Sequence, residues 1–305
     1  AEAAFGGAIL DDVLSGRLSL MTQNREDWID NGYTGLDDVM GSHREWAGRA
    51  QLLFTPTESL DALFNIHARS LRGTSAVFRA NIVGPGNNNL NGNFDRDTVW
   101  FDSTFNNPQA YDSWGTSATV NYYMDDLTLT SITAVETAEG YSLGDIDGGN
   151  LVTGPGFIPF PSETQDGIDE LDQFTQEIRL ASADDQPTTW QIGAYYFDSQ
   201  FNITTVGPNG GFPPSTTVRH KNQLWSVFAQ ASHQLTDRLE LSGGVRFTND
   251  EKLMTGIVTS IPVQPVSVED EQVSWDLSAY YDLDDSQAVF ARIARGFRGS
   301  GGQKS

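Results

Sequence analysis

The sequence predicts an all-β fold: a transmembrane, antiparallel, up-and-down β-barrel wall with short turns at one end and long loops at the other. Three observations predict it. Apolar and polar residues alternate with a period of two through about twelve segments of the chain. Short and long connections alternate between these segments, as they do in outer-membrane barrels. Finally, an aromatic residue opens nearly every segment that follows a long connection.

The alternation is clearest in segment 45–54. Trp46 and Phe54 share its apolar face, whereas Arg49 lies on the opposite face. Segment 62–69 repeats the pattern after a short polar connection, so the two segments are expected to form a β-hairpin with one apolar and one mixed polar face.

Five further pairs of segments show the same organisation, and most are near the ~9–11 residues with which a tilted strand crosses a bilayer. They are 5–10 with 15–28, 114–124 with 127–138, 174–183 with 190–201, 225–235 with 239–250, and 275–283 with 288–297. The phase of 127–138 is unclear, which is consistent with a β-bulge in that strand.

The connections between the hairpins are long, whereas those within the hairpins are tight and acidic. The long connections are predicted at about 29–44, 71–113, 139–173, 202–221 and 251–270. Loops of this length are uncommon in compact soluble domains and typical of the extracellular side of outer-membrane barrels. The loop at 139–172 carries eight Asp and Glu residues and no Lys or Arg. Because it is long and the turn at 125–126 at the opposite end is tight, it is expected to face the outside of the cell.

The two faces of the predicted wall differ in chemistry. The apolar face is predicted to carry an aromatic girdle at the membrane interface, formed by Trp46, Trp114, Phe174, Trp225 and Trp275. The other face is predicted to line a wet lumen with the charged residues Arg49, Arg69, Glu177, Arg179 and Arg246. The alternative is a soluble β-sandwich, whose outer face would be solvated.

Composition excludes several classes of protein. The 305 residues carry a net charge of −23, which disfavours a nucleic-acid partner. No apolar run approaches the ~20 residues of a transmembrane helix, and 33 aromatic residues argue against disorder. The absence of cysteine excludes disulfides and thiolate metal sites from this sequence. The sequence begins at Ala1 without a leader pattern, so we expect a processed chain or part of a longer one.

Several stretches resemble the barrel of TonB-dependent outer-membrane receptors. The hairpin motif FTQEIRLAS followed by WQIGAYYF resembles the middle of that barrel, and so do LTDRLELSGGVRFTND and VFARIARGFR further along the chain. The stretch 44–80 is similar to an early hairpin of the same barrel. These motifs occur in the order in which the family has them, and the resemblance covers most of the chain.

The resemblance implies a single partial barrel domain over 1–305, with about twelve of about twenty-two strands and without the plug domain of the family. It further implies residence in the outer membrane of a Gram-negative bacterium, in contact with lipid and lipopolysaccharide. The implied function is TonB-dependent uptake of a scarce nutrient, most often a ferric siderophore or similar iron complex, with the TonB complex engaged through the plug. No cofactor is expected.

Candidate ligand contacts are aromatic residues of the predicted long loops: Trp100, Phe101, Tyr111 and Tyr141. Flat rings stack on sugars and chelates, although the same rings equally suit packing of a loop against its neighbours. Asp145 and Asp147 form a weak candidate for calcium, because hard oxygen ligands at alternate positions suit that ion. A solvated acidic loop is the alternative interpretation.

Enzymatic activity is not expected. The four histidines are scattered over the predicted strands and loops at positions 43, 67, 220 and 233, and no base and nucleophile are positioned together as hydrolysis requires. Two alternatives to a receptor remain open from the sequence. One is a passive porin made of a closed twelve-stranded barrel, and the other is a secreted all-β binding or adhesion module.

Overall fold

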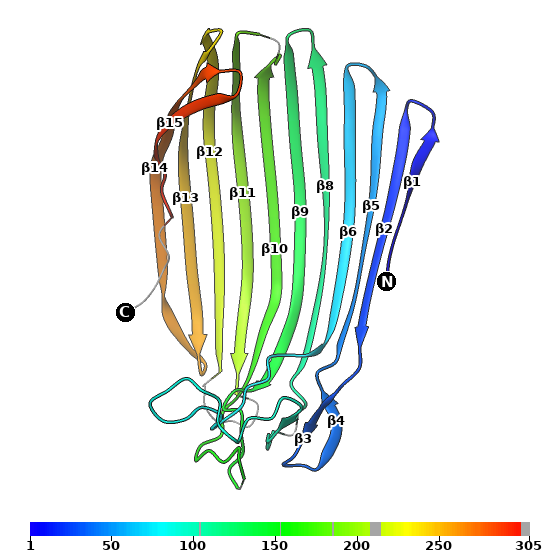
Figure 1. Cartoon of the computed structure of the whole chain (residues 1–305), viewed down its shortest axis with the longest axis vertical. Helices are drawn as coiled ribbons and strands as arrows, with labels where there is room; N and C mark the ends of the chain where they lie inside the picture. Colours follow the sequence, from blue (N-terminus) through cyan, green and yellow to red (C-terminus); the bar gives the residue numbers. More distant parts are fainter. Residues whose placement is uncertain (104, 153, 185, 208–214, 300–305) are drawn as a thin grey trace.

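The chain forms one large antiparallel sheet of twelve strands and one small sheet of three (Figure 1). The computed structural model describes residues 1–103, 105–152, 154–184, 186–207 and 215–299. Within these ranges no helix is long and apolar enough to cross a membrane. The large sheet is a meander, because each strand pairs with the next strand of the sheet along the chain. The predicted all-β antiparallel architecture is therefore confirmed.

The strands of the large sheet are joined in six hairpins, as the alternation predicts. They are β1 (Glu2–Leu10), β2 (Leu14–Arg25), β5 (His43–Thr57), β6 (Leu60–Thr74), β8 (Pro108–Met124), β9 (Leu127–Asp145), β10 (Glu163–Ser182), β11 (Thr188–Val206), β12 (Thr216–Thr236), β13 (Leu239–Val258), β14 (Ile261–Asp284) and β15 (Gln287–Arg295).

The small sheet lies beyond the large one, at the end where the long connections gather (Figure 1). Its strands are β3 (Ile29–Asn31), β4 (Leu36–Met40) and β7 (Thr98–Val99), in the order β4-β3-β7. It holds the compact apolar core of the chain, formed by Ile29, Met40, Val99 and Phe101. These strands have only two to five residues each, so no alternation in the sequence predicted this sheet.

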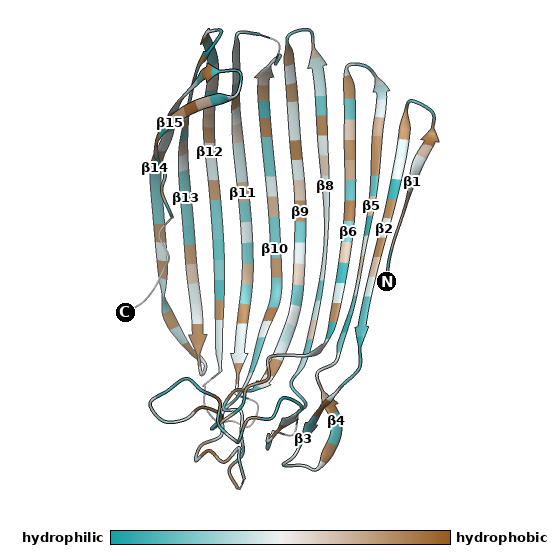
Figure 2. Cartoon of the chain, in the orientation of Figure 1, coloured by the Kyte–Doolittle hydropathy of each residue, from teal (hydrophilic) through white to brown (hydrophobic). Residues whose placement is uncertain are grey.

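Strand pairing separates the two chemistries onto two faces. Directly paired residues of an antiparallel sheet project to the same side. Ala50 pairs with Leu18 and Ile66, whereas Arg49 pairs with Ser19 and His67. We refer to the side that bears Ala50 as the apolar face and the side that bears Arg49 as the polar face. Figure 2 shows the resulting alternation as hydrophobic and hydrophilic bands along the strands.

The predicted connection at 251–270 is wrong, because these residues belong to strands β13 and β14. Their turn contains only Thr259 and Ser260, both with positive φ (47° and 68°). Two consecutive turn residues with positive φ form a type I′ turn. A sequence normally signals such a turn with Asn-Gly or Asp-Gly. The flanking strands also lose their alternation, because apolar residues occur on both faces there, as at the adjacent Leu253 and Met254, so periodicity did not mark them.

Three further connections are shorter than predicted. β6 continues to Thr74 and β8 begins at Pro108, so the predicted loop at 71–113 shrinks to 75–107. β9 continues to Asp145 and β10 begins at Glu163, so the predicted loop at 139–173 shrinks to 146–162. β11 likewise continues to Val206, and part of the following connection lies outside the described residues. The expected bulge within 127–138 is also absent: β9 pairs with β8 without a shift there, and the irregularity lies at Ile168–Leu171 of β10. Ser and Thr on the apolar face of β9 blurred the phase.

The two outermost strands of the sheet, β1 and β15, each pair with a single neighbour. Every residue of both strands is exposed. Each therefore presents one edge of unpaired backbone groups, which in lipid must find a further strand.

Candidate functional site

The polar face gathers the charged residues that the sequence predicts for a lumen. Pairing places Arg49 beside His67, and Arg179 in the same row as Arg246 through Gly193 and Phe228. Arg69 on β6 and Glu177 on β10 lie at strand positions whose side chains also project to the polar face. All five predicted lumen residues therefore share one face, although whether that face lines a lumen remains a prediction from geometry.

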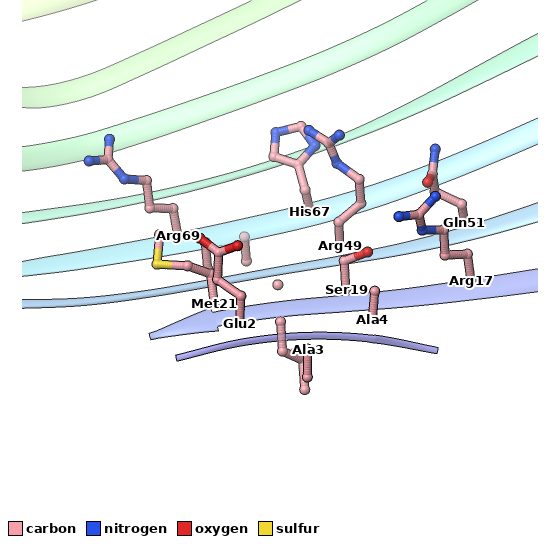
Figure 3. A pocket seen from close by; sticks show the side chains of 14 residues that line it. Glu2, Ala3, Ala4, Arg17, Ser19, Met21, Arg49, Gln51, His67 and Arg69 are labelled. Carbon is pink, nitrogen blue, oxygen red and sulfur yellow. The ribbon is translucent and has the colours of Figure 1, made fainter. Parts of the chain in front are cut away.

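A basic hollow lies on the polar face of β1, β2, β5 and β6. It has a volume of about 770 Å³, and Figure 3 shows Arg17, Arg49 and Arg69 extending from its wall to one side of the sheet. The Nε of Arg69 donates to Glu45, and His67 lies 3.1 Å from Glu136 on β9. Three arginines in so small an area are notable in a chain with a net charge of −23.

The five predicted girdle residues share the apolar face and are regularly staggered. Trp114 pairs with Ala68, and Ala68 pairs with Gly48. The row of paired residues that contains Trp114 therefore crosses β5 two residues away from Trp46. The same two-residue step separates Trp114 from Phe174 and Phe174 from Trp225. The step to Trp275 is four residues.

A stagger that always runs in one direction is what tilted strands require for residues at one height, since strand tilt and register are linked in a barrel. Most of these rings are well exposed, Trp46 to 54%. Phe174 contacts Tyr196 and Trp225 contacts Phe247, with ring centroids 6.2 and 5.4 Å apart. The geometry thus supports an aromatic belt, which stays a prediction.

The long connections fold together into one unit, which we call the loop cap and define as residues 28–42, 75–103, 105–107, 146–152 and 154–162. Hydrogen bonds join its parts: Asn31 Nδ2 donates to the Phe101 carbonyl (3.0 Å), and Asn150 Nδ2 donates to the Trp100 carbonyl (3.1 Å). The cap is therefore a packed structure and not a set of independent loops.

Two predicted ligand contacts serve this packing. Phe101 is 0% exposed in the core of the small sheet, so its ring is not accessible to a ligand in this conformation. Trp100 packs against glycines, and a Cβ added at Gly156 would lie 2.5 Å from its Cβ. The packing interpretation of these aromatics is the one that the structure favours.

The remaining two predicted contacts lie on opposite faces of the sheet. Tyr111 pairs with Leu71 and Gly140 in the polar-face phase, whereas Tyr141 pairs with Ala110 in the apolar-face phase. A single ligand on one face therefore cannot contact both rings. Of the four aromatics, Tyr111 alone combines the polar face with partial exposure, and its role as a ligand contact remains a prediction.

The Asp145 and Asp147 carboxylates are used as acceptors for backbone amides. Asp145 Oδ1 accepts from Gly148 N (2.9 Å), and the Asp147 oxygens accept from Gly149 N (2.9 Å) and Ser162 N (2.6 Å). Among the residues that the structure describes, no group of three His, Cys, Asp or Glu side chains is arranged to hold a metal ion. The geometry thus gives the calcium candidate no support.

Asp145 instead lies at the junction of two connections. It is 0% exposed, and its backbone N–H donates to Asn107 Oδ1 at 3.1 Å. Asn107 is also fully buried and donates to the Ala76 carbonyl. No acceptor or donor faces Asp145 Oδ2 within the described residues. The role of Asn107 was not predictable from the sequence, because an amide that bridges two connections has no local sequence pattern.

Protonation of Asp145 is expected to stabilise the loop cap. Burial, followed by repulsion from the Asp147 carboxylate, raises the pKa of Asp145 from its ordinary value of 3.8 to about 7. A raised carboxyl pKa contributes stability that is present at low pH and is lost as the pH rises through about 7. Amide hydrogen exchange at Asn150, whose N–H donates to the Gly156 carbonyl and not to Asp145, should therefore slow, after correction for the intrinsic rate, between about pH 8 and about pH 5.

The variant Asp145→Asn should remove most of this pH dependence and protect Asn150 already at high pH. Glu170→Gln is the matched control, because that side chain is exposed on β10 and its neutralisation should leave the pH dependence in place. An unchanged pH dependence in Asp145→Asn would contradict the assignment.

A twelve-stranded antiparallel meander with one apolar face that carries a staggered row of aromatic residues, and one charged face, is the architecture of the wall of an outer-membrane β-barrel. Residues 57–305 match the sequence model of the family described as "TonB dependent receptor-like, beta-barrel". The chain belongs to this family, and the segment is part of an outer-membrane protein of a Gram-negative bacterium.

Individual relatives agree with this assignment. The chain is 26% identical over 314 residues to a pesticin receptor of Yersinia enterocolitica, covering 97% of this chain and 41% of the relative. The solved ferric yersiniabactin uptake receptor FyuA of Yersinia pestis shares its fold, with a TM-score of 0.76, 21% identity, and coverage of 95% of this chain and 43% of FyuA.

The ferric-catecholate import receptor Fiu of E. coli K12 has the same fold, with a TM-score of 0.70, 14% identity, and coverage of 96% of this chain and 53% of Fiu. The chain thus spans less than half the length of the pesticin receptor that it matches.

Proposed function

We propose that this segment is the first part of the barrel of a TonB-dependent receptor that takes up a ferric siderophore or a similar iron complex. The observation that carries the proposal is the family match over 57–305 on a sheet with a charged face. In this proposal residues 1–305 form a single partial barrel domain, the polar face lines the lumen, and the loop cap meets the ligand outside the cell.

The names of several relatives support iron as the cargo. FyuA is described as a ferric yersiniabactin uptake receptor and Fiu as a ferric-catecholate import receptor. A receptor of Pseudomonas aeruginosa with a TM-score of 0.70 was solved with ferripyoverdine bound. The family match favours such a receptor over a passive porin or a secreted adhesion module.

The partners of the complete protein follow from the same proposal. The TonB complex is engaged through a plug domain outside these residues, and the outer wall contacts lipid and lipopolysaccharide. No nucleic-acid partner and no enzymatic reaction are assigned. A pyocin complex among the related structures suggests that the extracellular surface also serves as a protein receptor.

Energy-dependent iron uptake tests the proposal. A strain that lacks the full-length gene should lose growth on its cognate ferric siderophore under iron limitation, and the gene on a plasmid should restore it. Dissipating the proton gradient should stop uptake in the complemented strain, as TonB dependence requires. Uptake that continues without the gradient would instead support a passive channel.

The loop cap is expected to face the outside of the cell. A cysteine replacing Val152, which is 67% exposed, should react with an impermeant thiol reagent on intact cells. Residues 1–305 contain no cysteine, so the label reports on this position once any cysteine elsewhere in the full-length protein is replaced by serine. A cysteine replacing Asp126, in the turn between β8 and β9, should react only after the cells are broken. The reverse pattern would invert the topology.

A further inference from the structure

Arg246 on β13 differs from the other arginines of the polar face in how its guanidinium is held. Its Cζ lies 5.6 Å from the ring centroid of Tyr195 on β11 and 5.6 Å from that of Phe228 on β12. Strand pairing puts all three residues on the polar face. Over the described ranges of the chain, no carboxylate lies within ion-pair distance of this guanidinium.

A glycine fixes this arrangement. Gly193 pairs directly with Phe228, and a Cβ at Gly193 would lie only 2.5 Å from Phe228 Cζ and 2.8 Å from the Ile178 carbonyl oxygen. The ring of Phe228 therefore lies over the space that a side chain at Gly193 would occupy. Any larger residue at this position would push the ring away from the sheet and alter its contact with Arg246.

Beside Arg246 the polar face is hollowed, with a volume of about 490 Å³. Amide and hydroxyl groups of Gln191, Gln230 and Ser274 line the hollow, together with the carboxylates of Glu177 and Asp276. Both carboxylates already have arginine partners, since Glu177 lies 3.2 Å from Arg179 and Asp276 lies 3.3 Å from Arg292.

We propose that Arg246 is the centre of a binding subsite for a carboxylate or a similar planar oxyanion on the inner wall of the barrel. Aromatic rings that contact a guanidinium restrict its orientation while its N–H groups remain available. A fork held in place in this way binds an oxyanion through two parallel hydrogen bonds and loses little side-chain entropy on binding.

The oxyanion has two sources with the same chemistry: a free small molecule, or an acidic side chain of polypeptide that fills the lumen. The proposal rests on the proposed function only in treating the polar face as the lumen wall. It does not require that the cargo be iron.

Calorimetric titration of the purified full-length receptor with citrate tests the first source. Arg246→Gln should weaken binding at least about tenfold, the loss of a charge-assisted bidentate contact. Arg246→Lys, which keeps the charge but not the fork, should also weaken binding and guards against misfolding of the first variant. Arg238→Gln is the matched control: Arg238 is exposed in the turn between β12 and β13 and lines neither hollow of the polar face, so its replacement should leave citrate affinity unchanged.

If the wild-type receptor does not bind citrate, the second source, an acidic side chain of polypeptide in the lumen, is tested by hydrogen exchange of the same protein. Arg246→Gln should then increase exchange in the polypeptide that occupies the lumen, and Arg238→Gln should not. Equal citrate binding by wild type and Arg246→Gln would overturn the proposal, and so would the absence of any response in both measurements. A failure of iron uptake in the wild type would contradict the proposed function. It would not change what citrate binding and hydrogen exchange report about Arg246.

Discussion

Replacing Ala50 with arginine is expected to prevent assembly of the full-length protein in the outer membrane, whereas arginine at the adjacent Gln51 should be tolerated. Ala50 lies on the apolar face between Leu18 and Ile66, and Gln51 lies on the polar face between Arg17 and Asn65. An arginine that faces lipid near the middle of the bilayer costs about 2–4 kcal/mol in a barrel. An arginine in a wet lumen keeps its hydration and costs much less.

The measurement is the amount of heat-modifiable barrel in the outer membrane for each variant. The account predicts a severe loss for Ala50→Arg and a near-normal amount for Gln51→Arg. Because the two positions are adjacent on one strand, they match in depth and differ only in the face they occupy. Similar amounts for both variants would mean that the faces are wrongly assigned.

Residues 1–305 expressed alone should not form a stable monomer in a bilayer. The edges of β1 and β15 carry unpaired backbone N–H and C=O groups along strands of nine residues each. Each such group costs several kcal/mol in hydrocarbon, so the open sheet is expected to aggregate through its edges. Closing twelve strands into a smaller ring would need a stagger other than the one that this sheet has.

Gel migration with and without heating, combined with protease resistance, reports the outcome. The full-length protein is the control and should give a resistant, heat-modifiable monomer. A monomeric barrel formed by residues 1–305 alone, with the conductance of a diffusion pore, would favour the porin alternative.

The sequence predicted the wall of the fold well, because a membrane and a wet lumen impose opposite chemistry on successive residues. This constraint is clear at Ala50 and Arg49, but the alternation is lost at the ends of β13 and β14, where apolar residues lie on both faces. The hairpin around Thr259 and Ser260 was therefore not predicted, since neither alternation in its strands nor a glycine in its turn indicated it.

The candidate site was less predictable, because its contacts join residues that are distant in sequence. An aromatic residue such as Phe101 looks the same in a sequence whether it binds a ligand or fills a core, and only the fold places it in the core. The face of Arg246 was predictable from alternation. The two aromatic rings that contact Arg246 were not predictable, since these contacts join residues of β11, β12 and β13.

The central claim is that one face of this sheet contacts lipid and the other contacts water. A cysteine scan over Phe64, Asn65, Ile66 and His67 of β6 in the full-length protein tests it most directly, with any cysteine outside residues 1–305 replaced by serine. Each cysteine is exposed in turn to a membrane-partitioning thiol reagent and to a water-soluble one. The account predicts that positions 64 and 66 react with the first reagent and positions 65 and 67 with the second. Reactivity that does not alternate, or that alternates in the opposite phase, would contradict it.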